Sequence, residues 1–428
     1  MLDIKFIREN VELVKMAAVK KKIVIDLDRL VVVDDARKAL MTTMETKKAE
    51  QNRVSADIAG ATDATGRAQL ITQMQALKSE IQADEEKLKP LLDEWKTLML
   101  QVPNIPDMSV PDGESDADNQ EVKVWNPDGS TGAPAPLPFA MRDHVDLMTA
   151  LKMVDFERGV KVHGFRGYFL TGDGARLSWA IWNYANDFFG AKGFEQLIGP
   201  TIVRKSNLYG TGHLPNDAED VYKTQDEDYL IGTSEVSTMG FYADEVLDQA
   251  TFPIKHLAFS PCYRREAGSH GKDTRGLIRV HEFFKVEQVV ICEASHEESV
   301  RLHEEINRNT EEFIESLGIP YHTVLNCGAD IGQGQVKKYD IELWVPGEKT
   351  YREISSASYF HDFQTRRFNI RYKDAAGVMR YAHSLNCTAI PTPRILVSLI
   401  ENFQQADGTI AIPKVLQPYF GKTQISPQ

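Results

Sequence analysis

The chain has 428 residues, 42% of them hydrophobic and 26% charged, so it can bury large cores, and its length favours two or three domains. No stretch approaches the roughly 18 consecutive apolar residues of a membrane span, and the N-terminus MLDIKFIREN lacks an apolar secretory core, so we expect a cytoplasmic protein with no membrane partner. The net charge of −13 argues against non-specific coating of nucleic acid, although it leaves local basic contacts to RNA open.

A long helical hairpin is predicted near the N-terminus. Between Val33 and Val102 glycine and proline are almost absent, and the break GATDATG divides the segment into two helices. From Leu70 onward the second helix repeats apolar residues at alternating spacings of three and four, which is typical of a coiled-coil seam. The first helix carries a weaker seam, and the two helices are each other's natural partners.

Polar residues interrupt both seams of this hairpin. Asp84 breaks the second, Lys47 and Gln51 break the first, and Pro90 is expected to kink or locally disrupt the second helix because it removes a backbone donor. The surface charge of the hairpin is mixed rather than basic. On these residues alone, a spacer or self-associating coiled coil is as reasonable as an RNA-binding arm.

A linker and a second domain follow. Residues 102–120, VPNIPDMSVPDGESDADNQ, are rich in proline and acidic residues without periodicity. From near Val122, short apolar runs such as HLAFSPCY and YDIELWVP alternate with helical segments. Most connections between the runs are too short for crossover helices, so we predict an α+β domain with a mainly antiparallel sheet flanked by helices.

Two of these runs place charged residues on one sheet face. In PCYRREAGSHGKDTRGLIRVHEFFKVEQ, Arg264 and Glu266 are expected to share a face of one strand, and His281, Phe283 and Glu287 a face of the next. The polar, glycine-containing loop between them can reach over a ligand. A charged hairpin facing solvent is the alternative that spacing alone leaves open.

Two further stretches carry groups suited to phosphate chemistry. In YREISSAS, Glu353 and Ser356 offer oxygens of the kind that Mg²⁺ accepts alongside substrate phosphates, although a strand-end glutamate is often merely solvated. In LNCTAIPTPRILVSLIENFQQADG, Pro393 and Arg394 open a helix with an apolar face. A guanidinium at that buried helix start can grip a triphosphate or stack on a nucleobase.

The cysteines point to no metal site. They lie far apart with no C-x-x-C pair, so we expect neither zinc nor a disulfide framework, and we interpret all four as reduced thiols: Cys262, Cys292, Cys327 and Cys387.

Taken in order, these stretches resemble a known family. The arginine–glutamate strand pair resembles motif 2 of class II aminoacyl-tRNA synthetases, LIENFQ with its preceding arginine resembles motif 3, and GFEQLIGPTIV with Pro200 resembles motif 1. With the hairpin, GTSEVS and YREISSASYFHDFQTRRFNIRY, the chain resembles the bacterial-type seryl-tRNA synthetase family from Met1 to about Gly421. The resemblance implies an N-terminal tRNA-binding domain at 1–102 with its arm at about 33–100, a linker at 103–121 and a class II catalytic domain at 122–428.

The implied reaction joins serine to tRNA(Ser) through seryl-adenylate, with ATP and Mg²⁺. Catalytic roles fall to Arg264, which bridges serine's carboxylate and the α-phosphate, Glu266, which orients ATP near the adenine, and Arg394, which sandwiches that ring with Phe283. Glu353 and Ser356 would hold Mg²⁺. The implied ATP-binding set is Arg264, Arg265, Glu266, Val280, Phe283, Glu353, Ile354, Ser355, Ser356 and Arg394.

The implied serine pocket reads an ammonium and a hydroxyl. The family's Thr-x-Glu element appears as Thr233, Ser234 and Glu235, with its carboxylate facing the amine. The full implied set is Thr233, Ser234, Glu235, Arg264, Glu287, Asn386 and Thr388. A site built to hydrogen-bond a hydroxyl rejects analogues that lack it, because its own buried groups go unpaired.

The resemblance also implies partners. Residues around motif 1 would form a homodimer, and the arm would contact the long variable arm of tRNA(Ser), with Lys47, Lys48, Arg53 and Arg67 as candidate phosphate contacts. Motif 3 departs from the glycine-rich family pattern at Cys387, Pro391 and Pro393, which stiffens that stretch. Two other functions stay open: an amino-acid-activating paralogue that loads a carrier protein, and a catalytically inactive scaffold-like paralogue.

Overall fold

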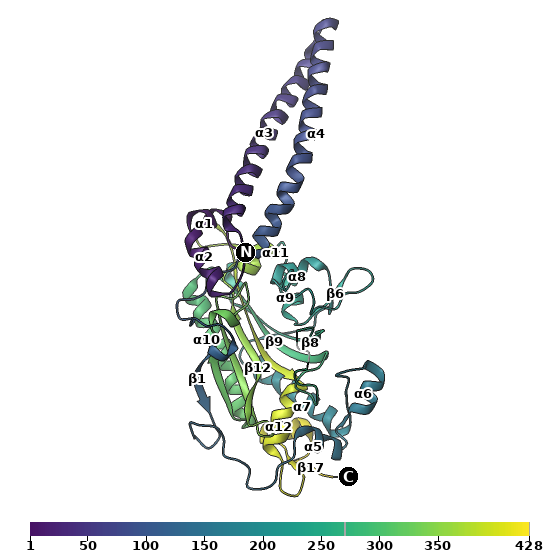
Figure 1. The fold of residues 1–428 in the computed structure, drawn as a ribbon, viewed down its shortest axis with the longest axis vertical. Helices are drawn as coiled ribbons and strands as arrows, with labels where there is room; N and C mark the ends of the chain where they lie inside the picture. Colours follow the sequence, from purple (N-terminus) through teal and green to yellow (C-terminus); the bar gives the residue numbers. More distant parts are fainter. Residues whose placement is uncertain (269–270, 428) are drawn as a thin grey trace. The chain divides into compact units, whose positions relative to one another are not determined.

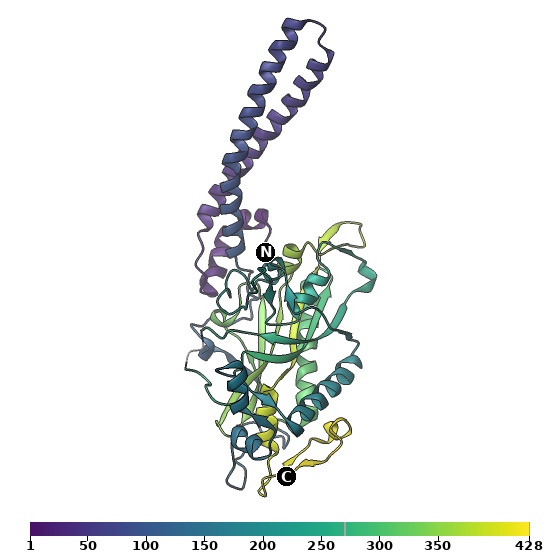
Figure 2. The ribbon, with the colours of Figure 1, turned by 90° about the vertical axis from the view of Figure 1, so that its right-hand side faces the viewer.

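The computed structural model describes residues 1–268 and 271–427, which form two compact units, Met1–Pro103 and Asn104–Gln428. The first unit is helical, and its two long helices run side by side as an antiparallel hairpin (Figures 1 and 2). Asp26 and Asp63 cap these helices by accepting hydrogen bonds from the backbone N–H groups of Arg29 and Gly66. The helices of this unit are α1 (Ile4–Glu9), α2 (Val11–Lys20), α3 (Leu27–Gly60) and α4 (Ala64–Gln101).

The polar interruptions of the hairpin seam pair with each other. Lys47 of α3 donates to Asp84 of α4 at 2.7 Å, and Asp84 is 7% exposed. Nearer the base of the hairpin, the fully buried Asp34 accepts ion pairs from Arg8 and Arg37. Pro90 lies inside α4 and does not end it, since the helix continues from Ala64 to Gln101.

The second unit is built on an eight-stranded sheet in the order β1-β10-β11-β12-β15-β9-β8-β4. All neighbours pair antiparallel except β4 and β8, so the α+β class and the mainly antiparallel sheet are confirmed. The strands are β1 (Gln120–Trp125), β4 (Glu195–Leu197), β8 (Ile254–Tyr263), β9 (Glu282–Cys292), β10 (Tyr321–Leu325), β11 (Lys337–Val345), β12 (Thr350–Tyr359) and β15 (His383–Thr392).

Long helices cover one face of this sheet, and on the other face two short helices, α9 (Glu235–Phe241) and α11 (Phe363–Phe368), pack on β9 and β15 beside the site. Leu302, Ile306 and Phe313 of α10 (His296–Leu317) join Leu177 and Ile181 of α7 (Gly172–Gly190) in a core shared with β9, β12 and β15. Helix α12 (Arg394–Phe403) follows β15 directly and packs against β11 and β15. The shorter helices are α5 (His144–Ala150), α6 (Phe156–His163), α8 (Lys205–Thr211), α9 (Glu235–Phe241), α11 (Phe363–Phe368) and α13 (Gln417–Phe420).

The remaining strands are short and lie outside the main sheet. They are β2 (Val154–Asp155), β3 (Phe169–Leu170), β5 (Ile202–Val203), β6 (Tyr229–Leu230), β7 (Val246–Leu247), β13 (Arg371–Lys373), β14 (Met379–Tyr381), β16 (Ile410–Ala411) and β17 (Gln424–Ile425). Among the described residues, no helix is long and apolar enough to cross a membrane.

The segment expected to be a linker packs on the second unit. The Asn104 side chain donates to the carbonyl oxygens of Gly334 and Phe360, and Asp107 accepts from the Tyr359 hydroxyl at 2.8 Å. Asn119 receives the backbone N–H of Cys327. Residues 104–119 are therefore fastened to the sheet despite their irregular composition.

Candidate active site

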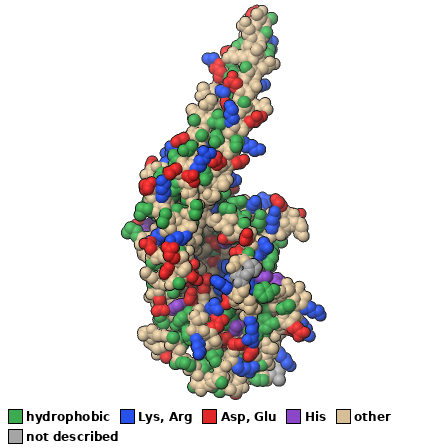
Figure 3. Space-filling model, viewed as in Figure 1, with side chains coloured by type: hydrophobic (Ala, Val, Ile, Leu, Met, Phe, Trp, Pro, Cys, Tyr) green, Lys and Arg blue, Asp and Glu red, His purple; other side chains and the backbone are tan. Residues whose placement is uncertain are grey.

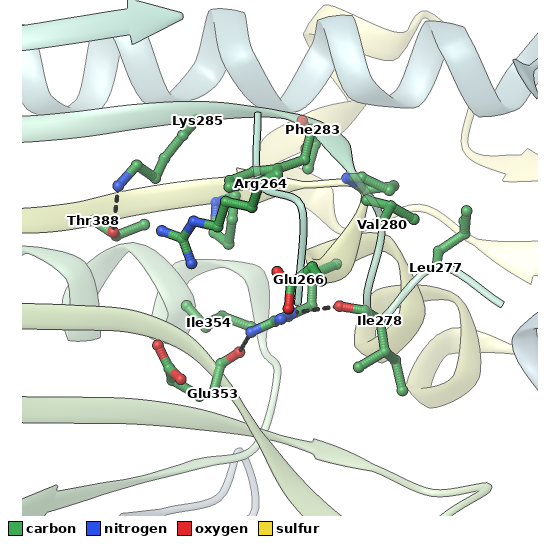
Figure 4. Close-up of a pocket in the computed structure, with 14 residues that line it drawn as sticks. Arg264, Glu266, Leu277, Ile278, Val280, Phe283, Lys285, Glu353, Ile354 and Thr388 are labelled. Carbon is green, nitrogen blue, oxygen red and sulfur yellow. Dashed lines mark hydrogen bonds between the residues drawn. The ribbon is translucent and has the colours of Figure 1, made fainter. Parts of the chain in front are cut away.

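Strand register brings the predicted residues together. Glu287 of β9 pairs with Ala258 of β8 on one side and with Thr388 of β15 on the other. A cavity, here called the Arg264 cavity, opens over these strands and is shown in Figure 4. Its lining includes Arg264, Glu266, Val280, Phe283, Lys285, Glu353, Ile354, Thr388 and Arg394.

The first strand ends earlier than the spacing predicted. Strand β8 stops at Tyr263, so Arg264 and Glu266 lie beyond it, and Glu266 has a left-handed backbone with φ +53°. The Arg264 guanidinium lies over the Phe283 ring, 5.2 Å from its centroid. Arg279 holds the Glu266 carboxylate at 2.6 Å. Ser269 and His270 of the following loop lie outside the described residues.

Arg394 is fixed by backbone carbonyls. Its Nε donates to Ile278 O at 2.8 Å and its Nη1 to Glu353 O at 2.7 Å, and the residue lines the Arg264 cavity. Burial lowers the pKa of Arg394, and the nearby guanidinium of Arg264 lowers it further. An anion bound here would relieve this accumulation of positive charge.

A second cavity, here called the Glu235 cavity, adjoins the same strands. Glu235 is 5% exposed and accepts from Gln364 of α11 at 2.6 Å. Burial raises the pKa of Glu235 to about 7, with a smaller contribution from the charge of Glu287. Burial also raises the pKa of Asp217 to about 6 in this cavity. No lysine, arginine or histidine in the described part of the chain forms an ion pair with Glu235, so a ligand ammonium would meet an unpaired carboxyl.

Three side chains at the edge of the Arg264 cavity form a hydrogen-bonded group. Lys285 Nζ lies 2.7 Å from Glu287 Oε2 and 3.4 Å from Thr388 Oγ1, and Thr388 Oγ1 donates to Glu287 Oε2 at 3.0 Å. Thr388 lines the Arg264 cavity, and Asn386, two residues earlier on β15, lines the Glu235 cavity. The group therefore lies beside both cavities.

Six predicted residues do not line either cavity: Thr233, Ser234, Arg265, Ser355, Ser356 and Glu287, of which Glu287 contacts the lining residues Lys285 and Thr388. Ser234 donates to Ala258 O, and Ser355 donates to Thr388 O from the helix-covered face of the sheet. Ser356 bonds Asp340 across the strand pair, and Arg265 is exposed beyond the end of β8. Thr233 supports the local backbone, because its hydroxyl accepts from the N–H of Glu235.

The sequence reasoning missed several residues of the site. Lys285 lies between Phe283 and Glu287 on the same strand face, so two-residue alternation could have identified it. Arg279 and Gln364 come from a loop and from a distant helix, and no pattern in the sequence links them to Glu266 and Glu235.

The residues present fit an Mg²⁺ ion that arrives with substrate phosphates. Among the described residues no group of three histidine, cysteine or acidic side chains could hold a metal ion alone. Glu353 nevertheless exposes its carboxylate in the Arg264 cavity (Figure 4). One carboxylate plus phosphate oxygens is a common Mg²⁺ environment.

Comparison with known proteins agrees with this geometry. Residues 220–403 match the family model of the tRNA synthetase class II core domain (G, H, P, S and T), and residues 1–106 match the seryl-tRNA synthetase N-terminal domain. The fold and the site thus define a class II aminoacyl-tRNA synthetase.

Similarity to individual proteins extends over the whole chain. This chain is 42% identical to a serine–tRNA ligase of Deinococcus radiodurans, over 99% of each sequence. The crystal structure of Pyrococcus horikoshii seryl-tRNA synthetase complexed with ATP matches with a TM-score of 0.89 and a sequence identity of 37%. The crystal structure of the cytoplasmic serine–tRNA ligase of Naegleria fowleri in complex with AMP matches with a TM-score of 0.85 and a sequence identity of 31%. Both matches cover all of this chain. The chain belongs to the serine–tRNA ligase family, which confirms the family, fold class and activity expected from the sequence.

Proposed function

We propose that this chain activates serine with ATP in the two adjoining cavities and transfers it to the 3′ end of tRNA(Ser). The observation that carries the proposal is the Lys285–Glu287–Thr388 group beside an anion-ready cavity and a cavity with a buried carboxyl. Serine offers the matching groups: a carboxylate to react at phosphorus, an ammonium and a hydroxyl.

In the first step a serine carboxylate oxygen attacks the α-phosphorus of ATP, and the bond to the departing pyrophosphate breaks. Arg264 bridges carboxylate and phosphate, and Arg394, held by two carbonyls, faces the nucleotide together with Phe283. Glu266 orients the adenine end. Glu353 would hold Mg²⁺ on the phosphates together with Ser356, whose hydroxyl now bonds Asp340, and the bound ion would supply neutralisation of the phosphate charge.

In the second step a terminal ribose hydroxyl of tRNA attacks the seryl carbonyl, and AMP leaves. Glu235, oriented by Gln364, holds the serine ammonium, and Thr233 steadies the backbone beside it. Glu287 and Thr388 read the serine hydroxyl, and Asn386 completes the polar lining.

The first unit is proposed to bind the long variable arm of tRNA(Ser). On the face drawn in Figure 3 the hairpin carries acidic and basic side chains intermixed along its length. Lys47, Lys48 and Arg53 pair with acidic residues of the arm itself. The pairs of Lys48 and Arg53 are exposed and worth little, so they can be exchanged for phosphates, whereas Lys47 is held by the largely buried Asp84. Binding by shape and backbone fits such a surface better than binding by net charge.

A homodimer through the motif 1 region is also proposed. Trp179 of α7 is 61% exposed and Ile198, just after β4, is 82% exposed. Trp179 and Phe169 border an apolar hollow against Phe259 and Phe284. Exposed apolar surface of this kind marks interaction sites. Light scattering at micromolar concentration should give twice the chain mass, and a fully active monomer would contradict the proposal.

The activity is tested by ATP–pyrophosphate exchange with serine, alanine, threonine and glycine. Serine should support exchange far better than the others. Exchange that is absent, or that prefers another amino acid, would overturn the proposed substrate.

The four cysteines are free thiols, which supports the proposed cytoplasmic location.

A further inference from the structure

Lys285 is a buried cation that contacts both candidate readers of the serine hydroxyl. Its side chain is 6% exposed, and its ammonium lies 2.7 Å from a carboxylate oxygen of Glu287. Figure 4 shows its hydrogen bond to Thr388 at the edge of the Arg264 cavity. Burying an ammonium costs free energy unless carboxylate and hydroxyl oxygens surround it. The position is therefore specialised, and the adenylation roles given above do not use it.

The chemistry of the three groups fixes the direction of their hydrogen bonds. An ammonium can only donate, so Lys285 donates to Glu287 Oε2 and to Thr388 Oγ1. Thr388 Oγ1 then points its own hydrogen at Glu287 Oε2. Glu287 Oε1 receives no hydrogen bond from any residue that the structure describes. Glu287 Oε1 is thus left as an anionic acceptor for a ligand, and the Lys285 ammonium keeps a third N–H that these two bonds do not use.

We infer that Lys285 is a specificity-determining positioning residue, which keeps Glu287 an acceptor so that the pocket takes only an amino acid whose side chain donates a hydrogen bond. The inference rests on the proposed function. Serine donates its hydroxyl hydrogen to Glu287 Oε1. Alanine fills the space but strands a buried charged oxygen, and an unpaired charged group costs more than an unpaired neutral one. A thiol is a weak donor and is disfavoured for the same reason.

Removing the Lys285 ammonium changes how readily Glu287 acts as a hydrogen-bond acceptor. Without Lys285, Glu287 is buried near the carboxyl of Glu235 from α9 and, on the same sheet face, the thiol of Cys262 on β8, whereas the Cys387 thiol on β15 faces α10 on the other side of the sheet. Burial and a like charge both favour its protonated form. When Glu287 is neutral, leaving its oxygen unpaired beside a bound alanine costs less free energy. Discrimination between serine and alanine therefore weakens.

The test is the ratio of kcat/KM for serine over alanine in pyrophosphate exchange by the full-length chain. In Lys285→Met the ratio should fall roughly ten- to a hundred-fold near pH 7 and recover as pH rises, because Glu287 ionises again. The wild-type ratio should stay level from about pH 6 to 8.5, since any titration of Glu235 affects both amino acids equally. Lys255→Met is the matched control, because Lys255 is also a largely buried lysine paired with a glutamate, on β8 away from the site. Its ratio should not change.

A competing role for Lys285 is a direct contact to the ATP phosphates. In that case Lys285→Met lowers exchange with both amino acids equally, the ratio holds at every pH, and the inference is overturned. If Lys285→Met does not fold, Lys285→Gln, which keeps donors but removes the charge, is measured instead with the same expectation. A wild-type chain without serine-dependent exchange would refute the proposed function itself.

Discussion

Arg264 is the side chain on which activation should depend most. Its guanidinium lies over Phe283 and makes one long bond to Gly232 O at 3.4 Å, so substrate contacts can replace that bond at little cost. Arg264→Ala should cut serine-dependent exchange by two to three orders of magnitude, with a ΔΔG‡ of roughly 3–4 kcal/mol. Arg264→Lys should recover little, because an ammonium cannot span carboxylate and phosphate in one plane. A lysine variant with near wild-type exchange would contradict the bridging role.

Glu235 should make serine binding depend on pH. Its raised pKa, about 7, means that the folded state favours the protonated form, so this contribution to stability is present below the unfolded value of about 4.3 and lost as pH rises through 7. An ammonium ligand requires the ionised form. The serine affinity should therefore weaken up to tenfold for each pH unit below 7, with proton release near pH 6.5.

Calorimetry in two buffers with different ionisation enthalpies measures that proton release. The Glu235→Gln variant should bind serine weakly, and its serine binding should release no proton. A serine affinity that stays level from pH 5.5 to 8 would show that the carboxyl is already ionised in the free protein.

At single positions, sequence patterns predicted what lies on the strands better than what lies in loops. Phe283, Glu287 and Thr388 come together because strand alternation and pairing dictate it. The left-handed backbone at Glu266 and its pairing with Arg279 depend on a turn that no periodicity encodes. Gln364 reaches Glu235 across 129 positions of sequence, a tertiary contact that composition cannot reveal.

Among the elements, α7 supports the site from behind. Trp182 Nε1 of α7 donates to Thr392 Oγ1 at 2.9 Å, and Thr392 lies two residues before Arg394. The Trp182 ring packs against Phe259 of β8 and Phe284 of β9. Trp182→Phe should raise the KM for ATP about five-fold, equivalent to about 1 kcal/mol, and leave that for serine unchanged. Thr392→Val should do the same, and the double variant should add nothing further. Strictly additive effects would show that the hydrogen bond does not position Arg394.

The helical hairpin was predictable as an element because its apolar spacing repeats over many turns. Its details were less so. Lys47 and Asp84 each interrupt the apolar seam of one helix, yet they form an ion pair between α3 and α4. Pro90 lies within the continuous helix α4, whose neighbouring turns and partner helix outweigh the loss of one backbone donor.

On the scale of the whole molecule, the account assigns activation to the second unit and tRNA recognition to the first. All of the proposed adenylation residues lie beyond residue 104, in a unit with its own core. Replacing residues 33–100 by a short turn should therefore separate the two reactions.

The decisive measurement is paired exchange and charging assays on the full chain and on this arm-deleted variant. We predict that the full chain charges tRNA(Ser) with serine, and that the folded variant keeps serine-dependent pyrophosphate exchange within a few-fold but loses charging. A full chain that exchanges without charging any tRNA would instead indicate an amino-acid-activating paralogue. A folded variant without exchange would contradict the assignment of activation to the second unit alone.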